Sequence, residues 1–134
     1  MKSEKSDKIE KVLAKYDLNS NQAKNLNEFV ESIHNFISED RHYYSDMINK
    51  KLFNLASKTG LMLLRSEKLS YELKLIESEI EKNKYKSKKT SIDKMAFEFK
   101  NNFEKLQKEV DKLYDEAMEI IKLIQSEYEK KQPV

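Results

Sequence analysis

The C-terminal third of the chain carries the pattern that most limits the fold. Between residues 92 and 128 an apolar side chain recurs every three or four positions, without a break, for about five heptads. This spacing is typical of a long helix that packs as in a coiled coil. Thr90 with Asp93, or Ser91, predicts its N-cap, and we expect it to run to about Lys131. The seam is Ile92, Met95 or Ala96, Phe99, Phe103, Leu106, Val110, Leu113, Ala117, Ile120 or Ile121, Ile124 and Tyr128.

Residues that form turns are scarce in the rest of the chain. The 134 residues include one glycine, Gly60, and one proline, Pro133, while 37% are charged and 38% are hydrophobic. A many-stranded β fold needs more turn residues than this. The expected fold is therefore all-α: one domain, residues 1–134, forming an elongated antiparallel three- or four-helix bundle with coiled-coil-like packing. Residues 1–19 are expected to form an N-terminal tether and a short helix.

That short helix is predicted over roughly residues 3–16, where Ile9, Val12 and Leu13 share one face. A turn is predicted over residues 17–21, which read Asp-Leu-Asn-Ser-Asn. A second seam then begins at Ala23. It continues for about 35 residues, with a polar interruption around residues 38–42. The pattern leaves open whether the helix continues through that interruption or bends back there, with Ser38 or Ser45 as a new N-cap.

Gly60 follows Ser-Lys-Thr, as a glycine does when it ends a helix in the left-handed conformation. We therefore expect the second seam to end at Gly60 and a third helix to run from about Leu61 to Asn83. That helix is apolar on two sides, as a central helix is. One side holds Met62, Leu69, Leu73, Ile76 and Ile80, and the other holds Leu64, Tyr71 and Leu75.

Residues 82–89 contain five lysines and are predicted to form a solvated loop. Such a run can touch phosphates, and Tyr85 can stack on a base. Lysine is nevertheless the default basic residue here, because Arg41 and Arg65 are the only arginines, and the net charge is only +2. A connector is favoured, and a nucleic-acid partner is not expected. No apolar run approaches the roughly 20 residues that cross a bilayer, which favours a soluble chain.

Few residues in the chain are suited to catalysis or metal binding. Without cysteine there is no thiolate ligand or cysteine nucleophile, and one glycine cannot form a phosphate-binding loop. The best metal candidates are Glu31 with His34 and Glu39 with His42, a spacing that di-iron bundles use. Both pairs lie on one segment, about 80° apart on a straight helix, and cannot share a metal. We expect solvent-exposed histidines, no metal or cofactor, and no enzymatic activity.

A binding epitope is predicted instead where the second seam is interrupted. The segment concentrates aromatic residues and holds one of the two arginines, and both residue types are enriched in binding hot spots. At most one of the two adjacent tyrosines can face the seam. The alternative is a kink whose aromatic side chains cap the bundle. The candidate residues are Phe36, Arg41, His42, Tyr43 and Tyr44, with Phe97 and Tyr114 as a second candidate site on the last helix.

Taken as a whole, the chain resembles the ectodomain of the small all-helical surface lipoproteins of Borrelia-type spirochaetes. The resemblance lies in the Lys-, Asn- and Ile-rich composition, the polar stretch from Lys2 to Lys8, the long heptad helix from Ile92 to Tyr128 and the absence of cysteine. Those proteins carry one cysteine, at a lipidated N-terminus. The resemblance implies a lipid-anchored protein on the bacterial outer surface that binds a host protein, such as a complement or matrix component. It transfers no particular site residues.

An intracellular helical adaptor, a secretion chaperone or a phage or plasmid accessory protein that acts by coiled-coil assembly is the alternative. On either hypothesis the partner is a protein. A surface ectodomain is expected to be a monomer and to touch a membrane only through a lipid anchor outside the given chain, whereas an adaptor is expected to be an obligate dimer.

Overall fold

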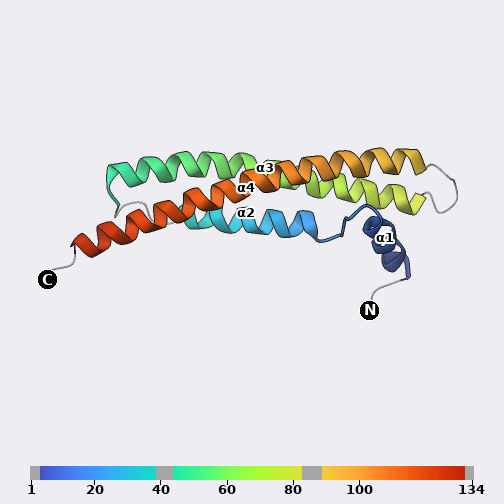
Figure 1. The fold of residues 1–134 in the computed structure, drawn as a ribbon, viewed down its shortest axis with the longest axis horizontal. Helices are drawn as coiled ribbons and strands as arrows, with labels where there is room; N and C mark the ends of the chain where they lie inside the picture. The colour runs from blue at the N-terminus through green and yellow to red at the C-terminus, as the bar shows by residue number, and fades with distance from the viewer. Residues whose placement is uncertain (1–3, 39–43, 83–88, 132–134) are drawn as a thin grey trace.

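The structure, a computed structural model, describes residues 4–38, 44–82 and 89–131, and all regular elements in those ranges are helices. The elements are α1 (Glu4–Ala14), α2 (Gln22–Ser38), α3 (Asp46–Lys82) and α4 (Lys89–Lys131). In Figure 1, α3 and α4 run in opposite directions along the whole length, α2 lies beside one half of this pair, and α1 is steeply inclined at the other end. The elongated all-α bundle predicted from the sequence is confirmed.

α1 ends in a turn built around Asp17, whose φ is 60°. The N–H of Leu18 donates to the carbonyl of Leu13 at 2.9 Å, and the N–H of Asp17 donates to that of Ala14 at 3.1 Å. These two bonds form a Schellman motif, in which Asp17 takes the left-handed position that glycine usually holds. Leu13 and Leu18 are both buried and close the turn.

Asn19 then caps α2, so the turn predicted over residues 17–21 is confirmed. Its Oδ1 accepts the N–H of Asn21 at 3.0 Å, while the Oε1 of Gln22 accepts the N–H of Asn19 at 2.6 Å. The reciprocal arrangement is that of a capping box. It fixes the direction in which α2 leaves α1.

The second predicted seam belongs to two helices. α2 ends at Ser38 and α3 begins at Asp46, while residues 39–43, where most of the polar interruption falls, lie outside the described residues. Ser45 is the N-cap of α3, because its Oγ accepts the N–H of Ile48 at 3.3 Å. Of the two caps that the sequence offered, the chain uses this one.

The predicted helix end at Gly60 is wrong. α3 continues through Gly60 to Lys82, and Gly60 does not have a positive φ. The seam keeps its alternating spacing of four and three across the glycine, so the same face of α3 stays on the core. A glycine inside a helix costs about 1 kcal/mol relative to alanine, and the buried contacts on both sides outweigh that cost. The seam of α3 is Ile48, Leu52, Leu55, Thr59, Met62, Ser66, Leu69, Leu73 and Ile76.

α3 is also not a central helix covered on both sides. Its second apolar side, Leu64, Tyr71 and Leu75, is exposed among the described residues. α2 and α4 both pack on the opposite side of α3, against the seam, and α1 is too short to cover the rest. The two sides of α3 therefore differ little in hydropathy because one of them is an apolar face that no described helix covers.

α4 ends at Lys131 as predicted, but it begins at Lys89. Thr90 and Ser91 therefore lie inside the helix, and the predicted N-cap at either residue is wrong. Asp93 instead accepts a hydrogen bond from the hydroxyl of Tyr16 and ties the turn after α1 to α4. Of the predicted lysine-rich loop, residues 83–88 lie outside the described residues.

α3 and α4 are joined by ion pairs one heptad apart. Lys58 Nζ lies 3.1 Å from a carboxylate oxygen of Glu116, and Arg65 pairs with Glu109. Both pairs are exposed, so each contributes at most about 1 kcal/mol. Their regular spacing is consistent with a single register along the antiparallel pair.

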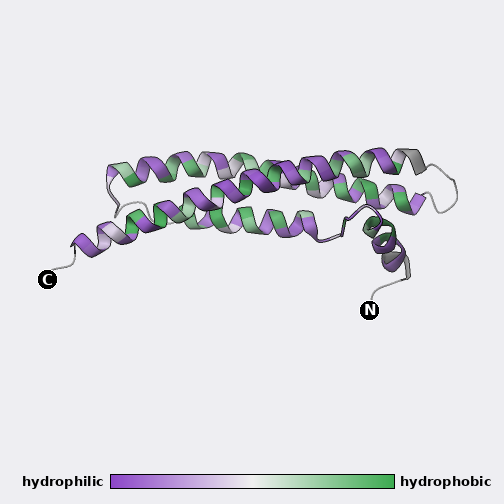
Figure 2. Cartoon of the chain, in the orientation of Figure 1, coloured by the Kyte–Doolittle hydropathy of each residue, from purple (hydrophilic) through white to green (hydrophobic). Residues whose placement is uncertain are grey.

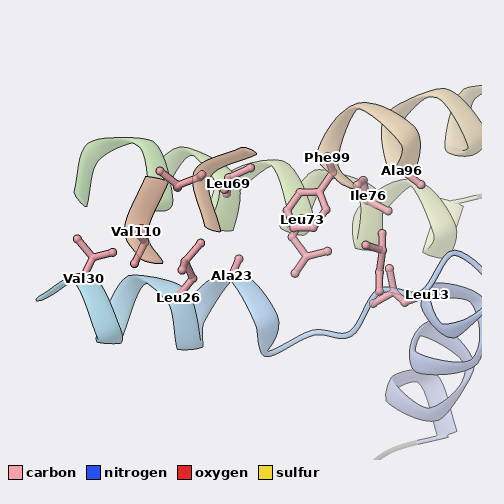
Figure 3. Close-up of a cluster of buried hydrophobic side chains, with 12 residues drawn as sticks. Leu13, Ala23, Leu26, Val30, Leu69, Leu73, Ile76, Ala96, Phe99 and Val110 are labelled. Carbon is pink, nitrogen blue, oxygen red and sulfur yellow. The ribbon is translucent and has the colours of Figure 1, made fainter. Parts of the chain in front are cut away.

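Buried side chains form two clusters along the bundle, and Met62 packs against both. Figure 2 shows how hydrophilic and hydrophobic residues alternate along the helices that supply them. The first cluster, which Figure 3 shows, lies toward α1 and comprises Leu13, Leu18, Ala23, Leu26, Val30, Leu69, Leu73, Ile76, Ala96, Phe99, Leu106 and Val110. The second comprises Ile33, Ile37, Ile48, Leu52, Leu55, Leu113, Ala117 and Ile120.

Candidate protein-binding surface

Large apolar side chains gather on one side of the bundle, where α2 lies beside α4. Phe29 and Phe36 of α2, and Tyr114 and Met118 of α4, are between 37% and 47% exposed. The rings of Phe29 and Tyr114 touch, with centroids 5.7 Å apart and planes tilted by 35°. We call these four residues the α2–α4 surface.

The parallel course of the two helices explains why these residues meet. Phe29 and Phe36 are seven residues apart and share one side of α2, and Tyr114 and Met118 are four apart on α4. Because α2 and α4 run in the same direction (Figure 1), equal steps from the Phe29–Tyr114 contact stay level with each other. Phe36 therefore lies two turns farther along, level with Ile121 and nearly one turn beyond Met118.

Acidic residues border this surface. Asp111 precedes Tyr114 by three residues and Asp115 precedes Met118 by three, while Lys122 follows Met118 by four; all three are exposed. A spacing of three puts side chains side by side on a helix. The surface thus has an apolar centre and a charged edge, with two carboxylates and one lysine.

On its other side α2 is fixed to α3 by two part-buried polar layers. Asn27 Nδ2 donates to Ser66 Oγ at 2.7 Å, and His34 Nδ1 lies 2.8 Å from Thr59 Oγ1. The Thr59 hydroxyl donates to the carbonyl of Ala56 at 2.9 Å, so His34 must donate from Nδ1. The two layers are one heptad apart on both helices, and such layers fix the register of a helix pair.

The sequence-based expectation of a solvent-exposed His34 is therefore wrong. Its ring is half-buried and hydrogen-bonded to α3, while Glu31 of the same predicted pair is exposed. The other pair, Glu39 and His42, lies outside the described residues. Within the described ranges, no group of three or more His, Asp and Glu side chains is placed to hold a metal ion.

Comparison with known protein families, with curated proteins and with solved structures finds no match for this chain. In the described parts of the chain, no helix is long and apolar enough to span a membrane.

The predicted epitope around the interruption is only partly described. Phe36 belongs to the α2–α4 surface, whereas Tyr44 is half-buried and packs against the second core cluster. Arg41, His42 and Tyr43 lie outside the described residues.

The two residues of the second predicted site lie apart. Tyr114 belongs to the α2–α4 surface, while Phe97, which is 67% exposed, lies 17 residues earlier on α4, away from the core-facing seam. At 1.5 Å per residue this is about 25 Å along the helix. The structure thus joins one residue from each predicted site.

Two members of the surface, Phe29 and Met118, were not among the predicted site residues. The separation of seven residues between Phe29 and Phe36 is visible in the sequence. What the sequence does not show is that α4 lies parallel to α2 and brings Tyr114 against Phe29.

Proposed function

We propose that this protein binds another protein through the α2–α4 surface. The supporting observation is that aromatic rings and a methionine from two helices form one partly exposed surface on a rigid support. Tyrosine, phenylalanine and methionine are enriched in protein interfaces, where aromatic rings bury a large area with little loss of conformational freedom. The α2–α3 polar layers hold α2 in place before any partner arrives, which lowers the entropic cost of binding.

The acidic border selects the kind of partner. Asp111 and Asp115 favour a protein that presents apolar side chains surrounded by lysine or arginine. The resemblance to spirochaetal surface lipoproteins suggests that this partner is a host serum or matrix protein, and that the chain is displayed on the outer surface through a lipid anchor. Both statements are part of the proposal.

The test compares a double variant with a matched control. Purified wild-type protein, Phe36→Ala/Tyr114→Ala and Phe97→Ala are immobilised and exposed to serum and to purified matrix proteins, and retained proteins are identified by mass spectrometry. We expect wild type and Phe97→Ala to retain the same partner, and the double variant to lose it. Added salt should weaken retention, because the border is charged.

Equal retention by all three proteins would contradict the proposed surface, and no retention of any protein would contradict the proposed partner class. The alternative, a helical adaptor that acts by coiled-coil assembly, is favoured by the uncovered face of α3. Binding by that route should be unaffected by Phe36→Ala/Tyr114→Ala.

A further inference from the structure

The uncovered face of α3 carries four large apolar side chains that no described helix covers. Phe53, Leu64, Tyr71 and Leu75 are between 42% and 64% exposed. Successive steps of 11, 7 and 4 residues keep them on one side of the helix, about half a turn from the seam. With Gly60, which lies between them on the same side, these residues form what we call the α3 outer face.

The α3 outer face is suited to a second copy of itself. α3 runs from Asp46 to Lys82, so Leu64 is its middle residue. When a second α3 is laid antiparallel with a two-fold axis at Leu64, Phe53 lies opposite the second copy's Leu75. This pair occurs twice, and Leu64 packs against its own equivalent.

Small residues lie where this alignment brings large ones. Ser57 falls opposite the second copy's Tyr71, and Gly60 falls opposite the aliphatic part of the second copy's Lys68. A Cβ placed on Gly60 would meet nothing within 4 Å, so the space beside this helix is open. Gly60 lowers the helix propensity of α3, although no neighbour within the chain requires a residue without a side chain there. A second helix that approaches closely at this position would require one.

The charges at the two ends of the face also match. Asp46 falls opposite the second copy's Lys82, and Lys50 lies beside the second copy's Glu79. Each of these pairs also occurs twice. In a parallel alignment like charges would meet, because Asp46 would lie against the second copy's Asp46 and Lys50 against its Lys50. The charges therefore favour the antiparallel arrangement.

We propose that two copies of this chain pair antiparallel through the α3 outer face, with the two-fold axis at Leu64. A face about 55 Å long and roughly 10 Å wide covers about 550 Å² per copy. Specific interfaces begin at about 600 Å² per partner, so the dimer should be reversible and concentration-dependent. This replaces the monomer that the resemblance implied.

The dimer is independent of the proposed function and adds to it. α2 and α4 pack on the opposite side of α3, so both α2–α4 surfaces stay open. Two binding surfaces in one particle raise the apparent affinity for a repetitive or immobilised partner.

Cysteine cross-linking tests the pairing directly, because the chain has no cysteine of its own. Leu64→Cys places two thiols at the axis, close enough for a disulfide, and Phe97→Cys is the matched exposed control. Under mild oxidation Leu64→Cys should form a covalent dimer at least about tenfold faster than Phe97→Cys. Equal rates would overturn the proposal.

The direction of pairing is tested by mixing two variants. Phe53→Cys should cross-link with Leu75→Cys faster than with itself. Faster self-linkage of Phe53→Cys would overturn the antiparallel arrangement.

Sedimentation equilibrium measures the same association without a cross-link. The wild-type mass should rise from 16.0 kDa toward twice that value with concentration. Leu64→Lys brings two like charges together at the axis and should weaken the dimer by more than tenfold, while Phe97→Lys should not. Phe36→Ala/Tyr114→Ala should dimerise like wild type, so failure of the dimer is distinguishable from failure of the proposed function. A wild-type mass that stays at 16.0 kDa up to millimolar concentration would overturn the dimer.

Discussion

Asp17 holds a left-handed backbone conformation that usually disfavours a residue with a β-carbon. It persists because the Schellman bonds and the Leu13–Leu18 contact close the end of α1 around it. Its carboxylate also lies 3.2 Å from Lys100 Nζ, but both side chains are exposed and the pair adds little. Backbone geometry, and not charge, therefore decides which residues are tolerated at this position.

Substitutions at Asp17 should separate the two effects. Asp17→Ala should lower the free energy of unfolding by about 1 kcal/mol, because alanine has no side-chain hydrogen bond to offset the left-handed conformation. Asp17→Gly should leave it equal or higher, and Asp17→Asn, which removes only the charge, should stay near wild type. Urea unfolding measures all three, and an alanine variant as stable as the glycine variant would contradict the assignment.

The Asn27–Ser66 layer is the second place where one residue determines a local arrangement. Ser66→Ala removes the acceptor of the Asn27 amide and should cost about 1 kcal/mol, the net contribution of one hydrogen bond, because Asn27 is only half-buried. Ser57→Ala is the control, because its exposed hydroxyl bonds only to the carbonyl of Phe53 in its own helix. That control should change stability by less than about 0.5 kcal/mol. Similar losses in both variants would rule out a special role for the layer.

At the scale of the elements, Gly60 distinguishes one long helix from two short ones. In a continuous α3, Gly60→Ala should raise the free energy of unfolding by about 1 kcal/mol, because alanine has the higher helix propensity and meets no neighbour. If the residue ended a helix in the left-handed conformation, the same change would destabilise the protein. Thermal and urea unfolding at low protein concentration give the sign.

The same glycine shows why the sequence predicted some helices and not others. α4 was predicted to its C-terminal residue because its seam is apolar throughout, so no competing pattern exists. In α3 the seam passes through Thr59 and Ser66, whose polarity hid a heptad spacing that in fact continues across Gly60. Periodicity over several heptads is a stronger determinant of helix continuity than local turn chemistry.

The candidate surface was less predictable than the helices. A seam identifies the buried face of a helix, but residues beside it, such as Phe36 and Phe97, face either a neighbouring helix or solvent. Which of these occurs depends on the packing of segments far apart in the sequence. The α2–α4 surface exists because α2 turns Asn27 and His34 toward α3, which leaves Phe29 to meet Tyr114.

α1 is held to the bundle by polar contacts as well as by Leu13. The hydroxyl of Tyr16 donates to Asp93 of α4, and Ser20 donates to Glu10. The bond to Asp93, with burial and the nearby negative charge, raises the pKa of Tyr16 to about 12. The protonated tyrosine is therefore favoured in the folded state.

This contact should weaken only at high pH. Its stabilisation is fully present below pH 10, the ordinary pKa of tyrosine, and is lost as the pH rises through about 12. The difference in tyrosinate absorbance between wild type and Tyr16→Phe should show one group titrating near pH 12, and Asp93→Asn should move it toward 10. A difference spectrum centred at pH 10 in wild type would show that the hydrogen bond is not formed.

For the whole molecule, the main feature is a core divided into two clusters. The Thr59 and Ser66 layers lie near the division, and Met62, between them in sequence, packs against both clusters. A side chain that touches both clusters couples their unfolding. The cooperativity of unfolding should therefore depend on the middle of α3 more than on either end of that helix.

Met62→Ala should lower the free energy of unfolding by about 1–2 kcal/mol, because the side chain is only partly buried. It should also separate the hydrogen-exchange protection of the two ends, so that α1 and the adjacent half of α4 open before the second cluster does. Phe97→Ala, on α4 and 67% exposed, is the control and should change neither quantity. Uniform loss of protection along the bundle in Met62→Ala would contradict a divided core.

The inclined seating of α1 has a mechanical consequence. A pulling force applied at the N-terminal end of the molecule would reach α1 before any longer helix, and would peel it away a few contacts at a time. The three longer helices would stay packed together, and Phe29 would stay in contact with Tyr114. Detachment of α1 would thus extend the molecule under tension, while the α2–α4 surface keeps its shape.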